Sequence, residues 1–244
     1  MEQEIKQLQR YIDEAKKIVF FGGAGVSTES GLPDYRSQEG TYTKLEKEHL
    51  NPKIVMSKRY MLENPVAFFN RPNTQKKLRP KPNAGHQYLA DLERSGKDVR
   101  IITQNVDGLH QKAGSKLVVE LHGNNRRFYC MKCGREYPLN DMPRDKDNVP
   151  RCPIDQGIIR ADVILFGENL DPRVLERSKA LLADSDLLII AGTSLSVYPA
   201  KNLVRHFGGK RVVVINKTPI DVPDLQVDLM IESEVGKTLE QLTI

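Results

Sequence analysis

Short runs of consecutive apolar residues recur along the chain, with stretches of helical periodicity between them. A run in which every position is apolar predicts a strand that is buried on both faces. The clearest runs are residues 18–21, 99–102, 187–191 and 212–215, and weaker ones are residues 117–121 and 163–166. Together they predict a parallel sheet with helices on both faces.

Helical periodicity fills most of the intervening segments. In residues 3–17, Ile5, Leu8, Ile12 and Ala15 recur at helical spacing with charged residues between them. Further helices are expected over residues 83–95, 171–184 and 199–207. This alternation of strands and helices predicts an α/β fold with a Rossmann-like parallel sheet.

Two segments interrupt the alternation. Residues 37–80 are polar with scattered aromatic side chains and prolines, and we expect helices and loops there. Residues 124–160 contain all three cysteines and show little periodicity. We predict that both segments are insertions and form a smaller second lobe. The Rossmann-like domain would then comprise residues 1–36, 81–123 and 161–244.

Length, charge and targeting signals narrow the class of protein. A chain of 244 residues has room for one α/β domain with an inserted module. The net charge is +5, and the basic residues are scattered along the chain among acidic ones. This distribution favours a solvated surface over a specific nucleic-acid site. The N-terminus lacks the apolar stretch of a signal peptide, and no run approaches the ~20 apolar residues that span a bilayer. We therefore expect a cytoplasmic protein without a membrane partner.

A glycine-rich loop follows the first predicted strand. Gly23, Ala24 and Gly25 would let the backbone approach a pyrophosphate closely, as in dinucleotide-binding folds. However, Thr28 stands where the full fingerprint has its third glycine or alanine, and no acidic ribose ligand is evident about 20 residues later. The loop alone is equally compatible with a tight turn between a strand and a helix.

Polar side chains follow the second predicted strand. Gln104, Asn105 and Asp107 come directly after residues 99–102, and ligands of open α/β sheets bind at such strand ends. Their amide and carboxylate groups suit sugar hydroxyls and a carboxamide. His122 similarly follows the run at residues 117–121, where a histidine can act as a general base, although a lone histidine is more often structural.

The cysteines predict a metal site. Cys130 and Cys133 have the spacing of half a zinc site, and Cys152 followed by Asp155 could supply the other half. A carboxylate oxygen is an accepted zinc ligand, so we expect one structural zinc ion in a zinc-ribbon-like module. The alternative is a module held by packing without metal. An odd number of cysteines argues against a disulfide framework.

Taken together, these loops resemble the sirtuin family of NAD-dependent protein deacylases, in its bacterial form. The resemblance covers nearly the whole chain, in the family's order. It is carried by residues 23–27, 30–36, 103–110, His122 with Gly123, residues 163–168, 192–195, 197–200, and Ile215 with Asn216. Sirtuins usually have a cysteine in the position of Asp155.

The resemblance implies a reaction in which NAD is consumed. NAD would be cleaved to nicotinamide, and the acyl group would pass from lysine to ADP-ribose. His122 would be the catalytic base that deprotonates a ribose hydroxyl. The implied NAD contacts are Gly23, Ala24, Gly25, Asp34, Tyr35, Arg36, Gln104, Asn105, Asp107, Gly192, Thr193, Ser194 and Asn216.

The acylated lysine protein or peptide would enter between the lobes. The implied substrate contacts are Val163, Phe166, Gly167, Glu168 and Val197, and the Val163 carbonyl would accept the substrate amide N–H. Sirtuins that favour succinyl or malonyl groups carry a Tyr-x-x-Arg pair in the helical insertion, and residues 64–71 lack one. Phe68 and Phe69 favour an apolar wall there, so we expect an acetyl or another neutral acyl group.

Three other functions remain open at this point. An NAD-dependent ADP-ribosyltransferase on the same fold would add mass to its target instead of removing an acyl group. A dehydrogenase would need the acidic ribose ligand that is not evident. A non-catalytic module binding zinc and nucleic acid would leave the glycine, Asn-Val-Asp and His-Gly segments unexplained.

Overall fold

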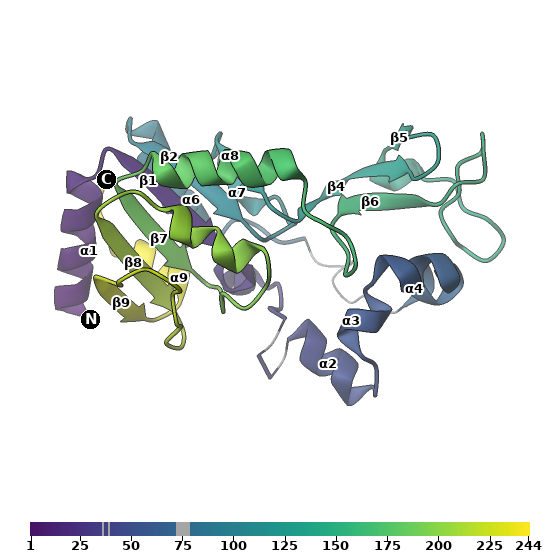
Figure 1. The fold of residues 1–244 in the computed structure, drawn as a ribbon, viewed down its shortest axis with the longest axis horizontal. Helices are drawn as coiled ribbons and strands as arrows, with labels where there is room; N and C mark the ends of the chain where they lie inside the picture. Colours follow the sequence, from purple (N-terminus) through teal and green to yellow (C-terminus); the bar gives the residue numbers. More distant parts are fainter. Residues whose placement is uncertain (36, 39, 72–78) are drawn as a thin grey trace.

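A sheet of six parallel strands organises the larger part of the molecule (Figure 1). The computed structural model describes residues 1–35, 37–38, 40–71 and 79–244, and the sheet order in it is β3-β2-β1-β7-β8-β9. The strands are β1 Lys17–Gly22, β2 Asp98–Thr103, β3 Val118–Glu120, β7 Leu187–Ala191, β8 Arg211–Asn216 and β9 Leu229–Glu232. The chain builds outward from β1 on one side and from β7 on the other. This order confirms the Rossmann-like prediction and reverses between β1 and β7.

Helices cover both faces of this sheet, because the central strands β1, β7 and β8 carry buried apolar side chains on both faces. Ile18 and Phe20 of β1 face a core built with α1 Glu2–Glu14, α6 Ala84–Arg94 and α9 Val235–Leu239. Val19 and Phe21 face the opposite core, which includes α8 Pro172–Ala183 and the short 3-10 helices η4 Ala200–Asn202 and η5 Val204–His206. All four of these β1 side chains are fully buried.

A second, three-stranded antiparallel sheet lies at the other end of the molecule from α1 (Figure 1). It has the order β5-β4-β6, with β4 Gly123–Cys130, β5 Glu136–Tyr137 and β6 Ile159–Val163. On the same side of the large sheet lie four short helices in succession, α2 Thr41–Lys47, α3 Pro52–Val55, α4 Lys58–Glu63 and α5 Pro65–Asn70, each of which contacts the next. Asn70 connects the two inserted segments: its Nδ2 donates to the Asp147 carbonyl at 2.9 Å, and its Oδ1 accepts from Asn148 Nδ2 at 2.7 Å.

Three elements differ from the sequence-based expectation. The strand expected over residues 163–166 is β6, which ends at Val163 and pairs with β4 in the small sheet instead of joining the large one. The helix expected over residues 199–207 is two separate 3-10 turns, because the chain leaves helical geometry at Phe207 and two glycines follow. Strand β9 was not anticipated, since its apolar run of three residues is too short to stand out.

In the part of the chain that the structure describes, no helix is both long enough and apolar enough to cross a membrane.

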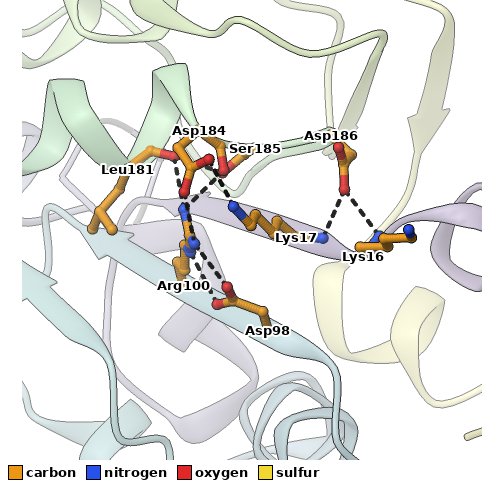
Figure 2. Close-up of polar contacts among 8 residues, drawn as sticks. All are labelled: Lys16, Lys17, Asp98, Arg100, Leu181, Asp184, Ser185 and Asp186. Atoms are coloured by element: carbon orange, nitrogen blue, oxygen red, sulfur yellow. Dashed lines mark hydrogen bonds and ion pairs between the residues drawn. The ribbon is translucent and has the colours of Figure 1, made fainter.

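The amino ends of β1 and β2 are tied to the end of α8 by charged side chains (Figure 2). The Arg100 guanidinium is only 9% exposed and donates to both carboxylate oxygens of Asp98, at 2.9 and 2.7 Å. It also donates to the Asp184 carbonyl at 2.9 Å, just beyond the last turn of α8. Lys17 Nζ reaches the Asp184 carboxylate at 2.7 Å. A cation that donates to terminal carbonyls satisfies groups that the helix itself leaves unpaired.

A lysine fixes α1 in a similar way. Lys97 Nζ donates to the carbonyls of Ile12, Asp13 and Ala15 at 2.9, 2.7 and 2.8 Å. These carbonyls lie at the C-terminal end of α1, where a positive charge is also favoured by the helix dipole. The edge of the sheet that holds these contacts is thus a structural edge.

Replacing Arg100 by Met should lower the free energy of unfolding by about 1–3 kcal/mol, because several charge-assisted hydrogen bonds are lost from a buried donor. The Asp98 and Asp184 carboxylates can still be solvated, which limits the loss. Urea denaturation should show a lower midpoint with an unchanged slope. Arg173→Met is the matched control, because Arg173 makes a similar contact to Asp171 but is 91% exposed. Equal midpoints for the two variants would contradict this account.

Candidate functional site

The carboxyl ends of the strands lie on the opposite edge from Arg100, and the predicted NAD-binding residues gather there. The glycine loop follows β1, Gln104 follows β2, His122 follows β3, Gly192 follows β7, and Asn216 ends β8. In open α/β sheets, ligands bind where the strand order reverses, which here is between β1 and β7. The fold therefore brings together side chains that are nearly 200 residues apart in the sequence.

The loops after β1 and β7 pack backbone against backbone. A Cβ atom on Gly23 would lie 2.7 Å from the Thr193 Cβ, and one on Gly25 would lie 2.8 Å from the Gly192 Cα. The Gly25 N–H donates to the Gly192 carbonyl at 2.8 Å. These glycines are thus required for the close approach of the two loops. Their contact with a pyrophosphate, and that of Ala24 between them, stay predictions.

A chain of hydrogen bonds links the glycine loop to the segment after β2. Asn105 is buried, and its Nδ2 donates to the Gly23 carbonyl at 3.0 Å and to Ser27 Oγ at 3.1 Å. Ser27 Oγ in turn donates to Asp107 Oδ2 at 2.8 Å, and Asp107 Oδ1 accepts from the Leu109 N–H. Sequence reasoning did not single out Ser27, although it lies in the same motif as the glycines. Asn105 and Asp107 are held in fixed orientations by these bonds.

His122 lies next to this network. Its Nδ1 is 3.0 Å from the Gln104 carbonyl, and because a carbonyl can only accept, Nδ1 carries the proton in the neutral ring. Nε2 then keeps a lone pair with which to accept a proton. Burial lowers the pKa of His122, and the hydrogen bond to the Gln104 carbonyl opposes this only in part. The ring is therefore neutral, and able to act as a base, at neutral pH.

Gln104 is itself fixed from both sides. Its backbone N–H donates to the Gly22 carbonyl at 2.9 Å, and its side-chain Nε2 donates to Thr193 Oγ1 at 3.0 Å. Since its carbonyl also accepts from His122, Gln104 connects the ends of β1, β3 and β7. Thr193 is mostly buried, whereas Ser194 is exposed.

Asn216 is the last residue of β8 and lies at the far end of this edge from His122. Asn216 Nδ2 donates to the Thr218 carbonyl at 2.8 Å, which holds the side chain just beyond β8. The Gly192 N–H donates to the Ile215 carbonyl at 3.0 Å, so the loops after β7 and β8 are adjacent. This places Asn216 and Gly192 near each other, as the predicted adenosine contacts require.

The loop after η1 (Ala24–Ser30) approaches the predicted substrate loop through aromatic rings. Asp34 Oδ1 accepts from the Ser37 N–H, which shapes the loop. The Tyr35 ring lies 5.0 Å from that of Tyr42, and Tyr42 lies 6.1 Å from Phe166. Arg36, which was predicted to close over the reactive part of NAD, lies outside the described residues.

The predicted substrate loop, residues 163–168, lies directly beside His122. The Ile164 N–H donates to the His122 carbonyl at 2.9 Å, and Gly123 pairs with Val163 across β4 and β6. Gly167 is exposed. Val197 lies in the loop after β7, where its carbonyl accepts from the Lys201 N–H at 2.8 Å.

Two buried histidines beneath the site were not anticipated. The rings of His86 and His110 are 4.7 Å apart, and both are almost completely buried. Burial lowers the pKa of His86 to about 4 and that of His110 well below its usual value, so both rings are neutral. His86 caps α6 together with Asn83, whose Nδ2 also donates to the Val26 carbonyl in the glycine loop. The usual sequence signature of such a cap has Glu or Gln in the position of His86.

The cysteines and Asp155 converge at the end of the small sheet. The four ligand atoms of Cys130, Cys133, Cys152 and Asp155 lie within 4.8 Å of one another. A tetrahedral zinc ion separates two sulfurs by about 3.8 Å, and a sulfur from an oxygen by about 3.5 Å. Cys133 and Cys152 have their Sγ atoms 3.8 Å apart, and Cys130 Sγ is 3.4 Å from Asp155 Oδ1. This donor set fits one structural zinc ion.

The surroundings of the cluster also suit anionic ligands. The Gly157 N–H donates to Asp155 Oδ1 at 2.9 Å and, with smaller contributions from the thiols, lowers the pKa of Asp155 to about 2. The Lys132 N–H donates to Cys130 Sγ, and Tyr137 Oη donates to Cys152 Sγ. Such hydrogen bonds orient metal ligands and stabilise their negative charge.

Comparisons with known proteins agree with this geometry. A model of the Sir2 family matches residues 23–199. The chain belongs to the Sir2 family. It is 41% identical over 238 residues to an NAD-dependent protein deacetylase of Clostridium acetobutylicum, and the match covers 97% of each chain.

Solved structures of Sir2 proteins superpose over nearly the whole chain. One, described as "Structural Basis for the Mechanism and Regulation of Sir2 Enzymes", has a TM-score of 0.85 at 33% identity and covers 99% of this chain and 96% of its own. Another holds a deacetylated p53 peptide and 3'-O-acetyl ADP-ribose, with a TM-score of 0.85 at 32% identity and coverages of 97% and 96%. The predicted sirtuin resemblance is confirmed.

The cluster of three cysteines and Asp155 gives a direct prediction for Asp155. The purified protein should retain about one zinc ion per chain by elemental analysis, as a closed four-ligand site would. Asp155→Ala should release zinc to a chelator at least ~10-fold faster, since even the loss of an outer hydrogen-bond partner has that effect on affinity. Asp141→Ala is the control, because Asp141 is an exposed carboxylate of the same module. Zinc content near zero in the unsubstituted protein would refute the site.

Proposed function

We propose that this chain is an NAD-dependent protein lysine deacetylase. In this reaction NAD is split to nicotinamide, and the acyl group of an acyl-lysine is transferred to ADP-ribose. The observation that carries the proposal is the placement of His122, a neutral base beside both the nucleotide edge of the sheet and the loop at residues 163–168. The similar C. acetobutylicum protein carries the same activity in its name.

NAD would lie along the carboxyl edge of the large sheet. It supplies the bond to nicotinamide whose cleavage drives the transfer. Gln104, Asn105 and Asp107 would hold the nicotinamide ribose and carboxamide, and their fixed hydrogen bonds mean that little ordering is left to do on binding. Gly192 and Asn216 would contact the adenosine half, with Ser194 near the phosphates.

His122 would remove a proton from a ribose hydroxyl. Its Nδ1–H is engaged by the Gln104 carbonyl, so Nε2 is the atom that accepts the proton. The positive charge that then develops on the ring is stabilised by the same carbonyl. The acyl oxygen of the substrate would be the nucleophile that displaces nicotinamide. Because such an oxygen is a weak nucleophile, most residues of the site would orient the reactants and few would react.

The acyl-lysine peptide would add as an extended strand. Gly167 and Glu168 would pair with one side of it, and the loop containing Val197 with the other, through backbone hydrogen bonds. Backbone pairing accepts many sequences, so the acylated lysine provides most of the recognition.

The helical insertion would set the acyl preference. Phe68 and Phe69 of α5 form an edge-to-face pair with ring centres 5.2 Å apart. Residues 64–71 lack the Tyr-x-x-Arg pair that is found in sirtuins favouring acidic acyl groups. An acetyl or another neutral acyl group is favoured. The domain division at residues 37–80 and 124–160, the cytoplasmic location and the lack of a specific nucleic-acid partner stay predictions.

Product masses test the proposed function. The protein is incubated with an acetyl-lysine peptide, with and without NAD. We expect the peptide to lose its acetyl group only when NAD is present, with O-acetyl-ADP-ribose as the second product. A peptide or protein that gains ADP-ribose while the acetyl group stays in place would instead indicate an ADP-ribosyltransferase.

His122→Ala should lower kcat by about 10²–10⁴-fold, the usual effect of removing a general base. His206→Ala, which removes a histidine outside the site, should leave activity unchanged.

The pH profile offers a second measurement on the same residue. Only neutral His122 can act as the base, so activity rises with pH as the ring loses its proton. Because the pKa of His122 is lowered, half-maximal kcat/KM on the acid side should fall below pH 6.5, the ordinary value for histidine. An acid limb at or above pH 6.5, or wild-type activity in His122→Ala, would rule out this base.

A further inference from the structure

The loop at residues 163–168 is attached on two sides to other elements. On one side the Ile164 N–H donates to the His122 carbonyl at 2.9 Å. On the other side Phe166 exchanges backbone hydrogen bonds with the helical insertion, donating to the Met56 carbonyl at 3.2 Å and accepting from the Lys58 N–H at 3.0 Å. The loop therefore bridges the catalytic histidine and the helices that would line the acyl group.

Beneath this loop lies a buried arginine that the proposed reaction has not so far used. The Arg160 side chain is 4% exposed. Its Nη1 and Nη2 donate to the two carboxylate oxygens of Glu168, each at 2.9 Å, and Nη2 also donates to the Val163 carbonyl. Its Nε donates to the Ala161 carbonyl at 3.1 Å. One guanidinium thus contacts both the first and the last residue of the loop.

Glu168 completes the arrangement from within the loop. Its Oε2 also accepts from the Leu165 N–H at 2.9 Å, and Lys58 Nζ lies 3.5 Å from its Oε1. Burial raises the pKa of Glu168, but the hydrogen bonds from Arg160 and the Leu165 N–H outweigh burial and leave the pKa below its usual value. Glu168 is therefore ionised, and both of its carboxylate oxygens accept from Arg160.

A buried ion pair is a poor source of stability by itself, because desolvation of both charges opposes their attraction. What the pair does provide is geometry. A bidentate contact fixes the guanidinium in one plane, and a carbonyl has two lone pairs, so Arg160 can occupy one on Val163 and leave the other for a substrate N–H. The direction of the Val163 C=O is then set by Arg160.

We propose that Arg160, with Glu168 as its partner, is a positioning residue that aligns the acyl-lysine with the catalytic histidine. It holds the Val163 carbonyl toward the substrate amide and holds Gly167 in register for the peptide. This inference rests on the proposed deacetylase function. It assigns Arg160 no contact with NAD, and that separation makes the role testable.

Arg160→Lys is the test variant, because lysine keeps the charge but cannot make the bidentate contact while also reaching Val163. We expect KM for an acetyl-lysine peptide to rise by about 10-fold or more, since small losses of alignment have large kinetic effects. The Kd for ADP-ribose, measured by calorimetry, should stay unchanged. Glu168→Gln should show the same split, and it serves if Arg160→Lys folds poorly.

Arg100→Lys is the matched control. Arg100 is also buried and also makes a bidentate contact with a carboxylate, but it lies at the amino edge of the sheet (Figure 2). The Arg100→Lys variant should have a lower free energy of unfolding and an unchanged peptide KM. The inference is overturned if Arg160→Lys keeps the wild-type peptide KM, or if ADP-ribose binding weakens as much as peptide use. Inactivity of the unsubstituted protein would instead refute the proposed function.

Discussion

The close approach of two loop backbones, at the point where the strand order reverses, is the constraint on which the site depends. Gly25 and Gly192 leave no room for a Cβ atom between them. Their contact fixes the loop after β1 relative to the loop after β7. Asn105 then hydrogen-bonds to Gly23, and Gln104 hydrogen-bonds to Gly22 and Thr193, so the segment after β2 takes its position from the same two loops. His122 is in turn oriented by Gln104.

The amino and carboxyl edges of the large sheet differ in the kinds of polar side chain that they carry. At the amino edge, Arg100 and Lys97 pair with carboxylates and with the carbonyls at helix ends, and their contacts hold helices to strands. At the carboxyl edge, the side chains of Gln104, Asn105 and Thr193 are neutral amides and a hydroxyl, and the buried ion pair of Arg160 with Glu168 lies at the loop of residues 163–168. Charged side chains thus attach helices to strands at the amino edge, and at the carboxyl edge we propose that they align the substrate.

The sequence could predict the elements whose pattern is local. Four mainly apolar runs identified β1, β2, β7 and β8, because strands buried on both faces need apolar side chains on both; Arg100 in β2 is the one charged residue within these runs. Strand β6 was misplaced by several residues, because its outward positions are polar and only its pairing with β4 shows where it ends. Short strand β9 was missed for lack of length.

The candidate site likewise contains residues that a local sequence pattern predicts and residues that it does not. Gln104, Asn105, Asp107 and His122 could be found because they directly follow strands, and the zinc ligands because of their spacing. Ser27, His86 and Arg160 gain their roles from contacts with residues far away in sequence: Ser27 from Asp107, His86 from burial against His110, and Arg160 from the turn that brings Glu168 back to it. The local sequence does not distinguish His86 and Arg160 from ordinary polar positions, and Ser27 is marked only by its place in the glycine motif.

In the proposed function, the carboxyl edge of the large sheet breaks NAD in order to remove an acyl group. The most direct test measures the amounts of nicotinamide and of deacetylated peptide formed in one reaction with an acetylated peptide. We expect the two products to appear in equal amounts, and nicotinamide release to stop when the acetylated peptide is left out. Free lysine formed without nicotinamide, or nicotinamide released at the same rate without the peptide, would contradict it.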